Sequence, residues 1–174
     1  MKLTVVITMA GLGSRFRKAG YNVPKYMIEV HGKTLFEWSM ESLEGYYDKE
    51  NEYIFIVRKE DDSKAFIEGM GEKLGYKKVT VVEIDYLTDG QATTAMLAAP
   101  HWDKESPLMI YNIDTYVEAG EMTTEQIQGD GFLPCFHADG DHWSFVKLGE
   151  DGKAEEVREK SRISDNCTLG AYYF

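Results

Sequence analysis

Two glycines and several cations follow the first apolar segment of the chain. KLTVVI is followed by Gly11 and Gly13, then by Arg15, and later by the pair Pro24-Lys25. Glycine lets backbone N–H groups approach a phosphate closely, and a guanidinium can bind two phosphoryl oxygens at once. A lysine beside a proline sits on a restrained backbone and suits a second phosphate. The residue types and their order therefore predict a site for a small polyphosphate anion.

The glycines alone do not define the site. No Gly-Lys-Ser/Thr follows at the distance that a P-loop requires. Phe16 stands where a dinucleotide-binding loop would have its third glycine. A plain tight turn is the alternative for the glycines, and the cations that follow favour phosphate binding.

The charge distribution points in the same direction. The chain has 174 residues and a net charge of −11, which argues against a nucleic-acid-binding protein. Residues 1–36, in contrast, contain six lysine and arginine residues and one acid. A local cationic patch on an acidic protein suits a small anion such as a nucleotide.

The size and composition indicate one globular domain without a membrane-spanning run, so we expect a cytoplasmic protein. Its beginning, MKLTVVITMAG, has an apolar stretch too short for a secretory signal. The two cysteines, Cys135 and Cys167, provide no disulfide framework.

The elements that must position these residues follow from the apolar pattern. Strands are expected at 2–8, 53–57, 79–84 and 107–113, and helices at 34–47, 60–74 and 91–99. Such alternation is typical of right-handed crossovers in a mostly parallel sheet. After about residue 130, short strand-like pieces with a turn at 149–153 predict an antiparallel addition to the sheet. The expected fold class is α/β, a Rossmann-like three-layer α/β/α arrangement with a mostly parallel mixed sheet and an antiparallel C-terminal part.

Ligands of open α/β sheets bind beyond the carboxyl ends of the strands. Three of these ends, MAGLGSR, DYLTDGQ and NIDTY, are rich in polar or glycine residues. Asp114 ends the fourth strand and is either a Mg²⁺ ligand or a turn residue. Asp85 and Gln91 either read a nucleotide base or brace their turn.

The chain contains AGLGSR, followed by PK and MIEVHGKTL. This combination resembles the signature of nucleotidyltransferases of the nucleoside-diphosphate-sugar pyrophosphorylase family. Members of that family have a GT-A-like fold. The resemblance implies an enzyme that joins an NTP to a sugar 1-phosphate and releases pyrophosphate. The product would be a nucleotide-activated sugar for surface polysaccharide. The cofactor would be Mg²⁺. The chain departs from the family at Ile113, where glycine is usual.

The resemblance also implies roles for the matching positions. Arg15 and Lys25 would be catalytic, and Asp114 would bind the metal. Nucleotide binding is expected from Ala10, Gly11, Gly13, Ser14, Asp85, Gly90 and Gln91. Acceptor binding is expected from Glu159, Lys160 and Gly170.

Several alternatives remain open at this point. The acceptor could be phosphocholine or another non-sugar phosphate, which would make the protein a cytidylyltransferase. Family members usually continue past the strand that matches Gly170–Phe174 and supply a second metal ligand there. We therefore expect residues 1–174 to form a single nucleotidyltransferase domain without that C-terminal segment, and a catalytically incomplete nucleotide-binding domain is a further alternative. A glycosyltransferase would show two acids flanking one residue, and NIDTY has one acid.

Expected partners are an NTP, a phosphorylated small molecule and a possible second copy of the chain, but neither nucleic acid nor a membrane.

Overall fold

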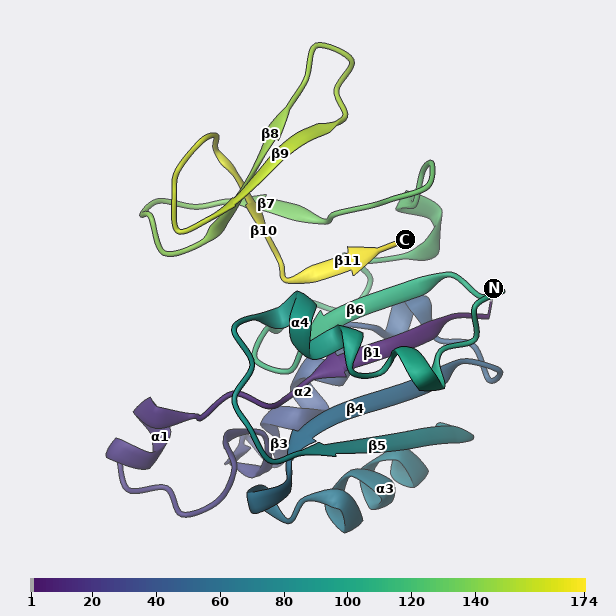
Figure 1. Ribbon diagram of the computed structural model, residues 1–174, viewed down its shortest axis with the longest axis vertical. Helices are drawn as coiled ribbons and strands as arrows, with labels where there is room; N and C mark the ends of the chain where they lie inside the picture. The colour runs from purple at the N-terminus through teal and green to yellow at the C-terminus, as the bar shows by residue number, and fades with distance from the viewer. Residues whose placement is uncertain (1) are drawn as a thin grey trace.

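Five strands form the central sheet, in the order β11-β6-β1-β4-β5 (Figure 1). Four of them run parallel, and β11 pairs antiparallel with β6. The structure is a computed structural model and describes residues 2–174. The strands are β1 (Thr4–Thr8), β4 (Glu52–Arg58), β5 (Lys78–Ile84), β6 (Leu108–Asn112) and β11 (Ala171–Tyr173).

Successive residues of the central strands point to opposite faces of the sheet, and both faces are buried. Val5 and Phe55 belong to one apolar cluster, whereas Val6 and Ile56 belong to another on the opposite face. A parallel strand that is covered on both faces needs a near-continuous apolar run. The runs VVI and IFIV provide this, so these segments form β1 and β4.

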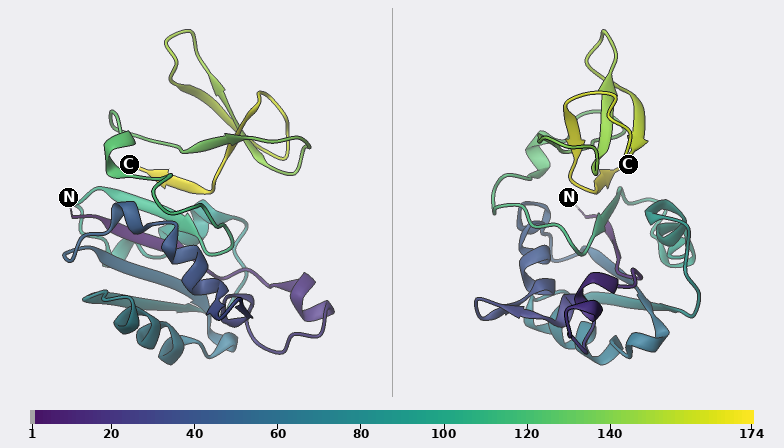
Figure 2. Two further views of the ribbon diagram at one scale, coloured as in Figure 1. Left: turned by 180° about the vertical axis from the view of Figure 1, so that it is seen from behind. Right: turned by 90° about the vertical axis from the view of Figure 1, so that its left-hand side faces the viewer.

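Helices cover both faces, which gives the molecule three layers (Figure 2). Phe36 of α2 and Ile67 of α3 pack in the first cluster, and Ala95 of α4 packs in the second. The expected α/β class with a mostly parallel sheet is confirmed. The helices are α1 (Ser14–Lys18), α2 (Leu35–Glu41), α3 (Lys64–Lys73) and α4 (Gln91–Met96). None of the helices within residues 2–174 has the length and apolar character needed to cross a membrane.

The predicted N-terminus of α2 is confirmed, but its predicted end is wrong. Thr34 Oγ1 accepts a hydrogen bond from the Glu37 backbone N–H at 3.2 Å, and Glu37 Oε2 accepts one from the Thr34 N–H at 2.9 Å. This reciprocal pair is a capping box. The helix ends at Glu41 rather than at residue 47. A Cβ at Gly45 would lie 2.2 Å from the Met122 backbone oxygen, so a close tertiary contact shapes the chain here.

The other two helices are also shorter than expected. α3 begins at Lys64 instead of residue 60, because Asp62 adopts a left-handed conformation with φ 44°. α4 ends at Met96 and is followed by a 3₁₀ turn. The short elements are η1 (Lys25–Met27), η2 (Glu44–Tyr46), η3 (Lys59–Asp61), η4 (Ala99–His101), η5 (Thr124–Gln126), β2 (Glu29–Val30) and β3 (Lys33–Thr34).

The C-terminal part forms a second, antiparallel sheet of four strands in the order β7-β10-β8-β9. It stands beyond the β11 edge of the central sheet (Figures 1 and 2). The turn at 149–153 is confirmed, with the Gly149 N–H bonded to the Lys153 oxygen at 2.9 Å. The expected addition to the central sheet is correct for β11 alone, because the other strands pair with one another. They are β7 (Cys135–His137), β8 (Ser144–Leu148), β9 (Ala154–Glu159) and β10 (Asn166–Thr168).

Candidate active site

The three polar strand ends meet in one cavity of about 330 Å³, as the sequence predicts. Parallel strands place their carboxyl ends at the same edge of the sheet, which brings segments far apart in sequence together. The cavity is lined by Thr8, Met9, Ala10, Gly11, Lys25, Leu87, Thr88, Asp89, Gly90, Gln91, Thr94, Asn112, Ile113 and Asp114.

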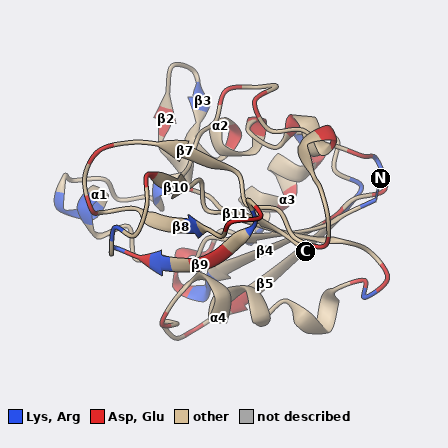
Figure 3. Ribbon diagram, turned by 90° about the horizontal axis from the view of Figure 1, so that it is seen from above, with Lys and Arg blue, Asp and Glu red and all other residues tan. Residues whose placement is uncertain are grey.

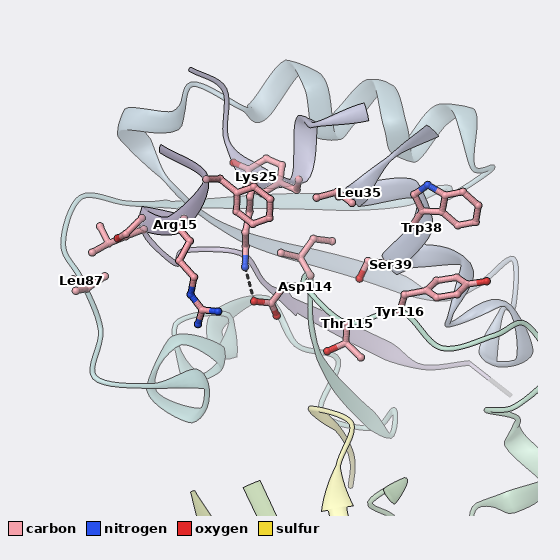
Figure 4. Close-up of a pocket in the computed structure, with 15 residues that line it drawn as sticks. Arg15, Lys25, Leu35, Trp38, Ser39, Leu87, Asp114, Thr115 and Tyr116 are labelled. Atoms are coloured by element: carbon pink, nitrogen blue, oxygen red, sulfur yellow. Dashed lines mark hydrogen bonds and ion pairs between the residues drawn. The ribbon is translucent and has the colours of Figure 1, made fainter. Parts of the chain in front are cut away.

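A larger cavity of about 690 Å³ adjoins the first and shares Lys25, Leu87, Ile113 and Asp114 with it. One side comes from the glycine segment and α1, and the other comes from α2 and the turn after β6 (Figure 4). The cavity is lined by Leu12, Gly13, Ser14, Arg15, Phe16, Lys25, Tyr26, Leu35, Trp38, Ser39, Leu87, Ile113, Asp114, Thr115 and Tyr116. One end is thus cationic and the other is aromatic.

Gly13 shapes the segment that carries Arg15. Its φ of 60° lies in the left-handed region that glycine adopts at little cost. Its carbonyl accepts hydrogen bonds from the N–H groups of Phe16 and Arg17 at 3.0 and 3.1 Å, which starts α1. Arg15 on this short helix is exposed and lines the larger cavity. Figure 3 shows the lysine and arginine residues of α1 grouped at one end of the molecule.

Lys25 and Asp114 form an ion pair at the boundary of the two cavities. Lys25 Nζ lies 2.5 Å from Asp114 Oδ2 (Figure 4). The Lys25 side chain is 16% exposed and that of Asp114 is 54% exposed. A cation and a carboxylate are therefore in contact where both cavities open, and either can exchange its partner for a ligand.

Hydrogen bonds hold the turn that carries Asp114 against the core. The Tyr111 hydroxyl donates to the Thr115 oxygen at 2.8 Å, and the Val117 N–H donates to Ser42 Oγ of the segment after α2 at 2.8 Å. Burial raises the pKa of Tyr111, so this hydroxyl keeps its proton and remains a donor at neutral pH. The backbone that follows Asp114 is consequently held at two points.

Asp114 also fits a metal by its chemistry. Mg²⁺ commonly takes one or two protein carboxylates and completes its shell with water and substrate phosphate oxygens. Asp114 offers one such oxygen ligand, half-exposed on both cavities. Within residues 2–174 there is no cluster of three or more His, Cys, Asp or Glu side chains that could hold a metal by itself.

Gly170 and Gln91 join the first cavity to the second sheet. Gln91 Nε2 donates to the Gly170 oxygen at 3.1 Å. Gly170 has φ 72° and forms the turn between β10 and β11. A Cβ there would lie 2.7–2.8 Å from side-chain atoms of Asn112, which lines the cavity. The positive φ and the close approach of Asn112 therefore both disfavour any side chain at position 170.

Gly170→Ala is expected to lower the free energy of unfolding by about 1–3 kcal/mol, from left-handed strain and from the contact with Asn112. Gly152→Ala is the matched control, because Gly152 has φ 77° and its Cβ would meet nothing within 4 Å. Urea denaturation measures both. A larger loss at Gly170 isolates the effect of Asn112, and equal losses would show that this contact does not matter.

Three predicted site residues lie apart from the two cavities. Asp85 directly follows β5 but lines a separate hollow with Arg58 and Ile84, and it lines neither of the two cavities. Glu159 and Lys160 lie at the end of β9, pair with each other at 2.8 Å and are 71% and 69% exposed. In the present arrangement all three are separated from the residues that meet around Lys25 and Asp114.

The structure adds cavity residues that the sequence analysis missed. Trp38 and Tyr116 form the aromatic end of the larger cavity, with ring centroids 5.5 Å apart at 89°. Lys33 Nζ lies 4.7 Å from the Trp38 ring centroid. Asn112 has a buried Oδ1 without a hydrogen-bond partner within residues 2–174. The polar type of Asn112 at a strand end was a usable signal, whereas helical spacing favoured simple packing for Trp38.

Comparison with solved structures finds matches that extend over nearly the whole chain. No family model matches the chain, and no curated protein matches it. It is similar to the nucleoside-diphosphate-sugar pyrophosphorylase from Vibrio cholerae RC9, with 38% identity and a TM-score of 0.87. The match covers 98% of this chain and 72% of that one.

Two more distant structures share the fold. The inositol-1-phosphate CTP transferase from T. maritima has 18% identity and a TM-score of 0.82, over 100% of this chain and 70% of that one. A proposed glucose-1-phosphate thymidylyltransferase from Bacillus anthracis has 19% identity and a TM-score of 0.79. The match covers 99% of this chain and 71% of that one. At such identities the likeness concerns the fold alone. The fold, the meeting strand ends and the identity to the Vibrio cholerae protein together show that this chain belongs to the nucleoside-diphosphate-sugar pyrophosphorylase family and is a nucleotidyltransferase.

Proposed function

We propose that the protein transfers a nucleotidyl group from an NTP to a sugar 1-phosphate in the cytoplasm and releases pyrophosphate. The observation that supports this most directly is the contact between Lys25 and Asp114 at the boundary of two cavities. One cavity has the strand-end and glycine surfaces that suit a nucleoside. The other has a cationic end that suits the remaining phosphates.

The proposed reaction needs no nucleophile from the protein. A phosphate oxygen of the acceptor attacks the α-phosphorus of the NTP and forms the new P–O bond. The bond to the bridging oxygen breaks, and its electron pair leaves with pyrophosphate. Catalysis of such a transfer comes from positioning and from stabilising charge on the phosphate oxygens.

In this proposal each group has a distinct task. Lys25 contacts the reacting phosphates, and Arg15 binds the pyrophosphate portion through its guanidinium. The backbone around Gly11 and Gly13 approaches the triphosphate. Asp114 would hold Mg²⁺, and the ion would supply positive charge to the phosphates. Lys25, which pairs with Asp114 here, would turn its ammonium to the phosphate oxygens.

A second candidate keeps the chemistry and changes the acceptor to phosphocholine or another non-sugar phosphate. The aromatic end formed by Trp38 and Tyr116 favours it, because aromatic faces attract quaternary ammonium groups. Lys33 already places a cation over Trp38. We propose a role in surface polysaccharide synthesis only for the first candidate, in which the acceptor is a sugar 1-phosphate.

Pyrophosphate release tests the proposal directly. The protein is incubated with each of the four NTPs, with and without Mg²⁺, and with a mixture of sugar 1-phosphates and phosphocholine. We expect Mg²⁺-dependent release with a preferred NTP, and division of the mixture then identifies the acceptor. Release with phosphocholine alone would replace the sugar proposal by the second candidate. A rise in melting temperature with NTP but no release would contradict catalysis and leave a nucleotide-binding domain.

A further inference from the structure

The segment between Gly13 and Lys25 carries the proposed phosphate-binding cations but contributes little to the core. α1 has no buried residue, and residues 17–23 are all exposed. Phe16 and Tyr21 touch each other edge to face at 6.0 Å, which is a contact within the segment itself. Cations that must be aligned with phosphates need support from a more rigid part of the protein.

Asp61 of η3 reaches this segment from the end of β4. Its side chain is 5% exposed, and Oδ1 lies 3.2 Å from Arg17 Nη2. Its other oxygen, Oδ2, accepts a longer contact of 3.5 Å from the Tyr26 hydroxyl. Arg17 lies two residues after Arg15, and Tyr26 follows Lys25 directly. One buried carboxylate thus contacts a residue close to each of the two cations, Arg15 and Lys25.

The contact continues into the core through Tyr26. This ring is 2% exposed, and its hydroxyl oxygen shares a hydrogen bond of 2.8 Å with Ser63 Oγ. Ser63 is fully buried and precedes α3. Asp61 also lines a small hollow together with Gly13 and Lys25. Burial raises the pKa of Asp61, opposed by the charges of Arg17 and Arg58, so retaining an ionised group here has a cost.

We propose that Asp61 is a positioning residue for nucleotidyl transfer. It holds Arg17 and Tyr26, and through them it aligns Arg15 and Lys25 without contacting the substrate itself. The role in catalysis rests on the proposed function, whereas the ordering of residues 14–25 does not. An alignment error of about 1 Å can lower a rate by about a hundredfold, so a buried anchor of this kind has a measurable effect.

The test uses Asp61→Asn, which keeps the size of the side chain and removes its charge. Asp62→Asn is the matched control, because Asp62 is the neighbouring acid, is exposed and has φ 44°, a conformation that asparagine tolerates. Amide hydrogen exchange of residues 14–25 is measured in the nucleotide-free protein, together with the melting temperature. We expect exchange about fivefold faster or more in Asp61→Asn alone. Exchange equal to that of the control would overturn the proposal.

Kinetics test the consequence for catalysis. We expect kcat/KM to fall about tenfold in Asp61→Asn and not in the control. A double-mutant cycle with Arg17→Met should be non-additive, because both changes break the same ion pair. Additive losses, or an unchanged kcat/KM with an active parent, would overturn the positioning role. If the parent shows no transfer at all, the proposed function fails, while the exchange result still decides whether Asp61 orders the segment.

Arg17→Met also provides a second variant in case Asp61→Asn does not fold. Arg17 is 57% exposed, so its replacement breaks the ion pair without disturbing the core. Should Asp61→Asn fail to fold, faster exchange of residues 14–25 in Arg17→Met supports the proposal. Exchange equal to that of the parent in Arg17→Met would overturn it.

Discussion

Lys25→Ala is expected to lower the turnover number by about a hundredfold or more, which is the scale of one lost transition-state donor. Lys25 Nζ lies at the boundary of the two cavities and contacts Asp114 at 2.5 Å. In the proposed reaction its charge faces phosphate oxygens whose charge is redistributed as the bond to pyrophosphate breaks. The loss should therefore appear mainly in kcat, and pyrophosphate release under saturating NTP measures it.

Two further variants make this result specific. Lys18→Ala removes an exposed lysine at the end of α1 that lines neither of the two cavities. We expect it to retain nearly full turnover. Lys25→Arg keeps the charge but not the compact ammonium, so partial activity is expected. Equal activity of Lys25→Ala and Lys18→Ala would remove Lys25 from the mechanism.

Asp114→Asn is expected to reduce the Mg²⁺-dependent tightening of NTP binding by about tenfold or more. The change keeps the size of the side chain and removes the charge that a hard cation prefers. Asp114 is half-exposed on the turn after β6, so the fold should persist. The measurement is the NTP dissociation constant by calorimetry in Mg²⁺ and in EDTA, with the melting temperature as a check on folding.

The control for Asp114 is another exposed acid. Asp130→Asn changes the net charge equally and lies outside both cavities. We expect its NTP binding to respond to Mg²⁺ as the parent does. If Asp114→Asn shows the same response as this control, Asp114 is not the metal ligand. If NTP binding weakens equally in Mg²⁺ and EDTA, its role is to orient Lys25.

The limits of helix prediction in this chain arise from contacts between distant segments. The 34–47 helix stops at Glu41, and Gly45 then packs against the Met122 backbone. Residues 59–61 form the 3₁₀ turn η3 and α3 begins only at Lys64, where Asp61 and Ser63 bond to Tyr26. In both places a long-range contact overrides a local preference, and local periodicity cannot register such a contact.

The sequence by itself determined the central strands and the α/β class, and it predicts phosphate binding at Gly11, Gly13, Arg15 and Lys25. These features are local, because buried parallel strands need continuous apolar runs and the cations follow one strand end directly. Only the tertiary structure decided that Lys25 contacts Asp114 and that Asp61 holds Arg17. It also placed Trp38 beside Tyr116 and separated β7–β10 from the central sheet. Each of these depends on which distant segments pack together, and that choice is made by the whole core.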